Sequence, residues 1–201
     1  MTGCIRVFIS KNADAPNALV TFTRIDTLAL NSPNRFISSI YVDRGDPNHA
    51  WISYSGYSTL TPSTPGHIFS VRVDPSAGAA TWTNLDGSGA TMFPDFPATA
   101  LVVAPNGDLF AANDFDVLRL RIGGTNWEVA GFNLPKVEVA GLTVSPDGTK
   151  LYAATHGRSA WVANLPNDCA VCHKGQTITM PCNFSDYQRH VDHGDRRGLC
   201  P

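Results

Sequence analysis

The sequence predicts an all-β fold from its composition and from a repeated strand–turn–strand pattern. Of the 17 acidic residues, 15 are Asp and two are Glu, and Lys occurs four times against 11 Arg. Glu and Lys are typical of helix surfaces, whereas Asp and the 17 Gly and 14 Pro favour turns. Short apolar runs separated by such turns are typical of strands. The composition therefore argues against a helical bundle and favours many short strands.

The repeated pattern occurs in residues 38–56, 99–116 and 140–158. Each segment has an apolar strand, a turn of Pro, Asp, Gly or Asn, and a second strand rich in small and aromatic residues. The equivalent apolar positions are Ile40, Leu101 and Leu142. Leu101 and Leu142 are 41 residues apart, whereas Ile40 and Leu101 are 61 residues apart. The longer spacing fits an inserted Ser/Thr/Pro loop at residues 58–66.

Further strand-like runs complete these units. Two runs follow the first segment and two follow the second, but the third has one before the composition changes at Pro166. The expected runs are residues 67–74 and 80–85, 116–122 and 126–130, and 159–165. Residues 5–10 and 19–25 are expected to be the last two strands of a preceding unit. Four strands in about 40 residues are typical of a β-propeller blade. Residues 1–166 are therefore predicted to form about three blades and a leading half-blade.

This number of blades predicts an incomplete ring, because propellers close with about four to eight blades. The strands at residues 19–25 and 159–165 are expected to have open edges. We therefore expect self-association, or further blades upstream of this sequence. Trp82 and Trp127 occupy equivalent places in their units and are expected to pack between strands.

Several of these strings resemble the sialidase-like, Asp-box (BNR) repeat propellers of bacterial exported proteins. The strings are LYAATHGRSAW at 151–161, LFAANDFDVLRL at 109–120 and WISYSGY at 51–57. In the first unit, the residue types of an Asp box occur with a longer gap at Asp74, Gly78, Thr81 and Trp82. In the second unit, only the end of the Asp box occurs, at Gly124 and Trp127. The resemblance implies a fold that hosts many functions.

A sialidase-like glycoside hydrolase would need an arginine cluster, a Tyr/Glu nucleophile pair and an Asp acid. Arginines are available, but Glu occurs only at 128 and 138, and no Tyr/Glu pair can be named. A carboxylate pair could come from Asp43, Asp46, Asp114 or Asp116, although Asp at such places more often caps a turn. The leading hypothesis is therefore a non-catalytic repeat scaffold whose loops bind carbohydrate or protein, and the alternative is a fragment of a glycoside hydrolase.

Residues 167–201 are expected to form a separate small module rich in Cys and His. It resembles a short module at the ends of bacterial exported proteins, with the pattern CHKG…T…HxxHGDxxGxC. The matching residues are Cys172-His173-Lys174-Gly175, Thr177, His190, His193-Gly194-Asp195, Gly198 and Cys200. The resemblance implies no activity, and it supplies the pairing Cys172–Cys200, which leaves Cys169–Cys182.

Three chemistries for this module remain open. The first is a knot held by those two disulfides, because 35 residues bury little core. The second is a divalent metal site, for Zn²⁺ or Cu²⁺, because His190 and His193 lie one helical turn apart and His173 and Asp195 could join them. The third is a c-type haem for electron transfer, because Cys169, Cys172 and His173 form a literal CxxCH.

The net charge and the cysteines limit the class of protein and its compartment. The net charge of −2 and the 16% of charged residues argue against nucleic-acid binding. No apolar run reaches the roughly 18 residues of a membrane span, and residues 1–10 show no secretory signal. The clustered cysteines nevertheless favour a secreted, cell-surface or periplasmic protein. Cys4 is given no role.

Overall fold

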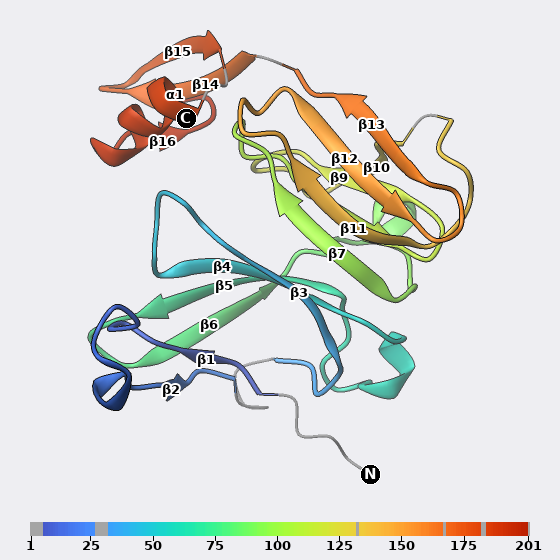
Figure 1. Ribbon diagram of the computed structural model, residues 1–201, viewed down its shortest axis with the longest axis horizontal. Coiled ribbons are helices and arrows are strands. Elements are labelled where there is room, and N and C mark those ends of the chain that lie inside the picture. Colours follow the sequence, from blue (N-terminus) through green and yellow to red (C-terminus); the bar gives the residue numbers. More distant parts are fainter. Residues whose placement is uncertain (1–5, 27–31, 132, 167, 182–183, 201) are drawn as a thin grey trace.

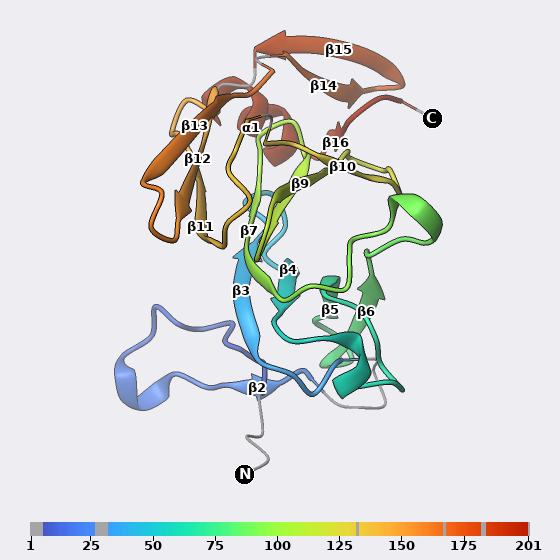
Figure 2. The same cartoon turned by 90° about the vertical axis from the view of Figure 1, so that its right-hand side faces the viewer.

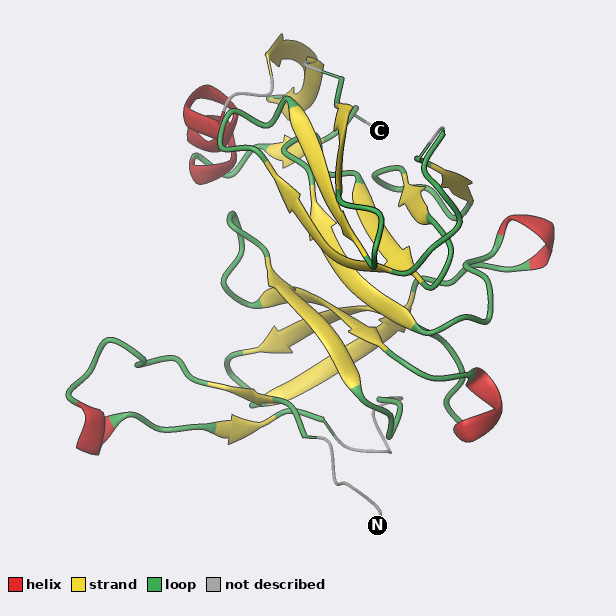
Figure 3. Cartoon of the chain, turned by 45° about the vertical axis from the view of Figure 1, so that its right-hand side comes forward, coloured by secondary structure: helices red, strands yellow, loops and turns green. Residues whose placement is uncertain are grey.

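The computed structural model describes residues 6–26, 32–131, 133–166, 168–181 and 184–200. The protein is all-β, with three antiparallel propeller-type blades, a leading hairpin and a small C-terminal module (Figure 1). Within the described residues the only α-helix, α1, spans Phe184–Asp192 and lies in the module (Figure 3). None of the described helices has the length and apolar character needed to cross a membrane.

Two blades have four strands and the third has three. Blade 1 contains β3 (Ile37–Val42), β4 (His49–Tyr54), β5 (Ile68–Asp74) and β6 (Ala79–Asn84). Blade 2 contains β7 (Ala98–Val103), β8 (Leu109–Asn113), β9 (Val117–Leu120) and β10 (Trp127–Val129). Blade 3 contains β11 (Val139–Val144), β12 (Lys150–Thr155) and β13 (Ala160–Asn164). In each blade the strands pair in chain order, as the repeats predict.

The remaining elements flank the blades. The leading hairpin pairs β1 (Phe8–Ile9) with β2 (Thr23–Arg24). The module contains β14 (Asp168–His173), β15 (Gln176–Pro181), α1 and β16 (Arg196–Arg197), with sheet order β15-β14-β16. In the described part of the chain, short 3-10 helices lie in loops: η1 (Asn17–Leu19), η3 (Ser58–Leu60) and η4 (Gly89–Thr91). Residues 58–66 thus contain no strand, as their composition predicts.

The first strands of the three blades are structurally equivalent and lie side by side (Figure 2). Ile40, Leu101 and Leu142 are each the fourth residue of their strand, and they pair with Ile52, Ala111 and Ala153. Each first strand also has a register shift between its first and third residues. Repetition of the bulge at one position confirms the alignment of the repeats, because a bulge re-aims a strand at a defined place.

Apolar side chains fill the spaces between neighbouring blades. One cluster joins blades 1 and 2 and includes Phe93 and Trp127; a second joins blades 2 and 3. A third joins the leading hairpin to blade 1 through Val7, Ile25 and Trp82. Trp82 is 4% exposed and Trp127 5%, which confirms their predicted burial. The hairpin therefore covers the face of blade 1 that a preceding blade would cover.

Blade 3 keeps an open edge in the described part of the chain. Its last strand, β13, pairs with β12 alone, and all five of its residues are exposed. At the other end of the arc, Leu19 and Phe22 are exposed beside the leading hairpin. These are the two edges that the repeat count predicts to be open, and self-association through them remains a prediction.

Candidate functional site

The C-terminal module is built on the hairpin of β14 and β15. His173 pairs with Gln176 across a two-residue turn in which Lys174 and Gly175 both have positive φ, at 48° and 81°. That conformation closes tight hairpins and favours Gly at its second position. Beneath the hairpin, Tyr187 of α1 packs on β14, and burial raises the pKa of its phenol to about 12.

A disulfide ties the end of the chain back to this hairpin. It joins Cys172 to Cys200, with a Cα–Cα distance of 4.8 Å. Beside it, the backbone N–H of Cys200 donates to Thr177 Oγ1 at 3.0 Å. Gly198, with a φ of 93°, donates its N–H to the carbonyl of Ala170 at 2.9 Å. The disulfide therefore holds His173, the next residue after Cys172, close to the segment that follows α1.

The C-terminus of α1 positions Asp195. The N–H of Gly194 donates to the Val191 carbonyl at 2.9 Å, and that of Asp195 donates to the His190 carbonyl at 3.1 Å. These two bonds, with Gly194 at a φ of 88°, form a Schellman cap. The cap explains the HxxHGD pattern, because it folds the residue after the glycine back against the first histidine.

Three side chains consequently converge. Asp195 Oδ2 accepts from His173 Nδ1 at 2.7 Å and from His190 Nδ1 at 2.8 Å, and the two rings lie 5.4 Å apart. Their ligand atoms all lie within 4.8 Å of one another. Hydrogen bonds from His190 and then His173 hold the pKa of the Asp195 carboxyl below its ordinary value. We call His173, His190 and Asp195 the His–Asp–His cluster.

His193 lies outside this cluster. It is exposed at the end of α1, and its backbone N–H donates to the carbonyl of Arg189. The sequence prediction placed His190 and His193 on one helical face, but the helix ends at Asp192. The residue that approaches His190 is therefore Asp195, carried back by the cap.

The residues present do not fit a c-type haem. Cys172 is bonded to Cys200 and Cys169 is also disulfide-bonded, so neither sulfur is available for a thioether. Both lie on β14, where residues three apart point to opposite faces of the sheet. The proposed Cys169–Cys182 pairing involves Cys182, which lies outside the described residues, as does Cys4.

A second candidate site lies where the module meets blades 1 and 2. Two adjoining cavities of about 490 and 400 Å³ share Ile122, Gly123, Arg196 and Arg197 in their walls. We call them together the module cleft. Five arginines line it against three aspartates, in a chain whose net charge is −2. The arginines are Arg72, Arg119, Arg121, Arg196 and Arg197. The aspartates are Asp43, Asp46 and Asp108.

The module is fastened to blade 1 at this cleft. The guanidinium of Arg197 contacts Asp43 Oδ1 at 3.2 Å and lies 5.7 Å from the centre of the Tyr187 ring. Asp43 Oδ2 contacts His49 Nδ1 at 3.0 Å, and His49 Nε2 contacts Ser70 Oγ at 2.9 Å. This polar chain was not predicted, because Ser70 lies 21 residues after His49 and no local spacing marks Asp43, His49 and Ser70 as a group.

The order Asp43–His49–Ser70 is that of a Ser-His-Asp hydrolase, but its setting is structural. Ser70 lies inside β5, which pairs with β4 on one side and β6 on the other. The backbone N–H groups beside Ser70 therefore belong to the sheet ladders, and none is left to stabilise an oxyanion. A hydrolase needs such donors. We therefore assign the polar chain of Asp43, His49 and Ser70 to the stability of blade 1 and of its contact with the module.

The four carboxylates considered for a glycosidase pair lie in two kinds of environment. Asp46 pairs with Arg72 at 2.8 Å, and Asp116 pairs with Lys136. Asp43 is held by His49 and Arg197, so these three serve ion pairs. Asp114 differs, because burial and then the charge of Glu138 raise the pKa of its carboxyl.

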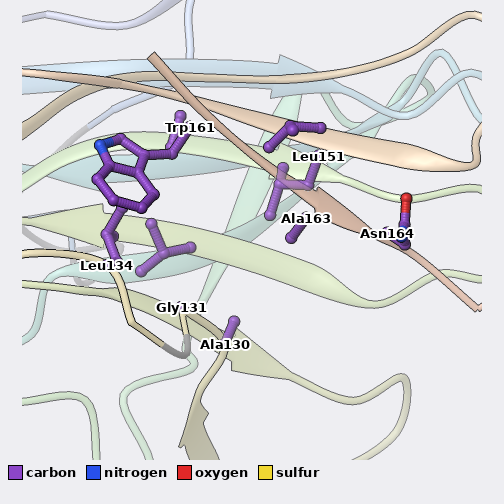
Figure 4. Close-up of a pocket in the computed structure, with 10 residues that line it drawn as sticks. Ala130, Gly131, Leu134, Leu151, Trp161, Ala163 and Asn164 are labelled. Carbon is purple, nitrogen blue, oxygen red and sulfur yellow. The ribbon is translucent and has the colours of Figure 1, made fainter. Parts of the chain in front are cut away.

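A third cavity is apolar and lies between blades 2 and 3 (Figure 4). Its volume is about 290 Å³, and its walls include Leu134, Leu151 and Trp161. None of the described residues that line it is charged. These residues offer no group for acid–base chemistry, and the cavity lies beside the exposed strand β13.

Neither a family model nor a curated protein matches this chain. Several solved structures are similar to it, and two of them have a TM-score of 0.50. One is described as the extracellular domain of a hybrid two-component system from B. thetaiotaomicron, at 16% identity over 79% of this chain and 19% of that one. The other is a gluconolactonase from Xanthomonas campestris, at 17% identity over 75% of this chain and 43% of that one. At these identities the likeness shows the fold alone, and this chain spans less than half of each.

Proposed function

We propose that this chain is a non-catalytic part of the propeller of an exported protein, and that it binds an acidic carbohydrate in the module cleft. Export is supported by the disulfide, since disulfides persist in oxidising compartments. It is also supported by the likeness to an extracellular domain. Blades with a binding cleft between their turns and an added module suit a scaffold that presents a ligand site.

The excess of guanidinium groups in the module cleft carries this proposal. Arg196 is exposed and lines both cavities, and among the described residues no carboxylate lies within ion-pair distance of it. Arg72 and Arg121 are each 62% exposed, so their ion pairs with Asp46 and Glu128 are accessible to solvent. Guanidinium groups bind carboxylates and sulfates in planar, two-point contacts.

An aromatic ring makes a carbohydrate the most suitable anion. Trp51 is partly exposed in the wall of the 400 Å³ cavity, and it packs on the His49 ring with centroids 4.1 Å apart. An indole fixed in this way presents an apolar face beside the arginines. A uronic acid offers both partners, an apolar ring face and a carboxylate.

Calorimetry with a galacturonic acid tetrasaccharide tests this function, with its uncharged methyl ester as the matched ligand. We expect the acid to bind and the ester to bind at least about tenfold more weakly, with the difference shrinking at high salt. Arg196→Ala should weaken binding of the acid, whereas Arg158→Ala, an exposed arginine in the β12–β13 turn, should not. Equal affinity for acid and ester, or no binding of either, would overturn the proposal.

A glycoside hydrolase remains the second candidate because of Asp114. Burial and then the charge of Glu138 raise the pKa of its carboxyl, as a general acid requires, and Glu138 would be its partner carboxylate. Glu138, the partner, also contacts His156 at 3.5 Å. Release of nitrophenol from a panel of aryl glycosides that is lost in Asp114→Asn would favour hydrolysis over binding alone.

A further inference from the structure

We infer that the His–Asp–His cluster is a binding site for a divalent transition-metal ion, best matched by Zn²⁺. The inference goes beyond the carbohydrate function, because none of the three residues lines the module cleft. It rests on the convergence of two imidazoles and one carboxylate from three separate segments of the module.

Each donor is held by a different structural device. His173 follows the disulfide-bonded Cys172 and begins the tight turn of the hairpin. His190 is part of the last turn of α1, and Asp195 is fixed by the Schellman cap that ends that helix. The site is therefore assembled before an ion arrives, which lowers the ordering cost of binding.

The donor types and their exposure suit zinc. Two imidazoles and one carboxylate form a set that leaves a fourth tetrahedral position for water. The side chains of His173 and His190 are 35% and 29% exposed, so an ion can enter, while that of Asp195 is 11% exposed. Imidazole also suits Cu²⁺, whereas Ca²⁺ and Mg²⁺ prefer oxygen ligands alone.

The geometry needs only a small adjustment. Tetrahedral Zn²⁺ with bonds of about 2.0–2.1 Å separates its ligand atoms by about 3.3 Å. The two contacts to Asp195 Oδ2, at 2.7 and 2.8 Å, must therefore lengthen by about half an ångström. All three ligand atoms already lie within 4.8 Å. Small side-chain rotations can supply this change, and the two Nδ1 protons leave as the ion binds.

The competing interpretation is that both histidines only hold Asp195 through hydrogen bonds. The two interpretations separate at His190→Asn, because an amide can still donate to Asp195 but is a much poorer zinc ligand. If the histidines are only structural, the properties of this variant should differ little from those of the parent. If they bind metal, the variant should lose zinc while its module is still folded.

Native mass spectrometry and calorimetry of the chelator-treated chain with ZnCl₂ test the inference. We expect one Zn²⁺ per chain. Affinity should fall more than about 100-fold in His173→Asn and His190→Asn, since even partners outside the ligand set change affinity by about 10- to 100-fold. His193→Asn is the matched control, because it changes an exposed histidine of the same module, and it should bind as the parent does.

Nitrogen NMR of the histidine rings shows which atoms bind. Zn²⁺ should shift the Nδ1 signals of His173 and His190 and leave those of His193 unchanged. An absence of zinc binding, or an equal loss of affinity in His193→Asn and His190→Asn, would overturn the inference. Neither result bears on the carbohydrate, whose test uses the module cleft and Arg196.

Discussion

Blade 2 and the C-terminal module are stabilised in different ways. All five residues of β8 are buried in blade 2, and apolar clusters cover both of its faces. Among the described residues, the module's buried cluster consists of Cys169, Val171 and Tyr187. Its short chain is held instead by disulfide-bonded cysteines, a cap and polar contacts to Asp195. Apolar burial thus stabilises the blade collectively, whereas in the module single residues have separate, specific roles.

The largest effect should come from removing a buried aromatic from blade 2. Trp127 packs edge-on against Phe93, and its indole N–H donates to the Leu85 carbonyl at 2.8 Å. Trp127→Ala should lower the free energy of unfolding by about 3–5 kcal/mol, measured by urea denaturation. Trp161→Ala is the matched control, because Trp161 is 40% exposed on β13. This substitution should lower the free energy of unfolding much less. Equal losses would show that β13 is covered in solution.

Breaking the disulfide should cause the next largest loss, confined to the module. Opening a loop of 28 residues costs about 3–4 kcal/mol in the chain-entropy model. Cys200→Ser should therefore expose the module's backbone amides to hydrogen exchange while those of β8 stay protected. Loss of protection in both regions at once would show that the module and blade 2 unfold as one unit.

The sequence predicted the blades well because their information is local and repeated. The alternation of apolar runs and turns predicted every strand of blades 1 to 3 within a few residues, and the equivalence of Ile40, Leu101 and Leu142. The module's histidines were harder to place. His193 was expected to join the cluster, but the cap ends α1 at Asp192 and leaves His193 exposed. Glycine after the second histidine was the available signal for that cap.

Contacts between the blades and the module could not be predicted. Asp43, His49 and Ser70 are polar residues in a repeat whose other units do not keep them, and Arg197 meets them only through the tertiary fold. The cleft depends on this docking as well. Its arginines are dispersed from Arg72 to Arg197, and no spacing in the sequence indicates that they share one surface.

The junction between the two regions should depend on pH through Asp43. Burial is the largest single influence and raises the pKa of its carboxyl. Hydrogen bonds from His49 and the Gly45 N–H, with the charge of Arg197, together outweigh burial and leave the pKa below its ordinary value. This carboxylate therefore adds stability above the unfolded pKa of about 3.9, and that stability is lost as pH falls through the lower folded pKa.

Asp43→Asn tests the junction. The variant should lose about 1–3 kcal/mol at pH 7, because Arg197 and His49 lose a charged partner. It should lose less at pH 3, which lies below the unfolded pKa of about 3.9, because there the parent has already begun to lose the stability that its carboxylate adds. The difference in the free energy of unfolding between the two proteins therefore narrows. Urea denaturation at both pH values measures this, with the exposed Asp14→Asn as control. If the difference in the free energy of unfolding is the same at both pH values, the effect of the substitution does not come from the charge of Asp43.

The smallest effect on stability is expected from two glycines. Comparing them separates the cost of backbone strain from the role of Gly194 in placing Asp195. Gly194 and Gly157 have positive φ, at 88° and 71°, and a Cβ at either position would meet no atom within 4 Å. Alanine at each should therefore cost about 1 kcal/mol, from conformation alone. Only Gly194→Ala alters the cap that carries Asp195 to His190. We expect it to shift the ring NMR signals of His173 and His190, whereas Gly157→Ala in the β12–β13 turn should leave them unchanged. Unchanged signals in both variants would mean that the disulfide, and not the cap, positions Asp195.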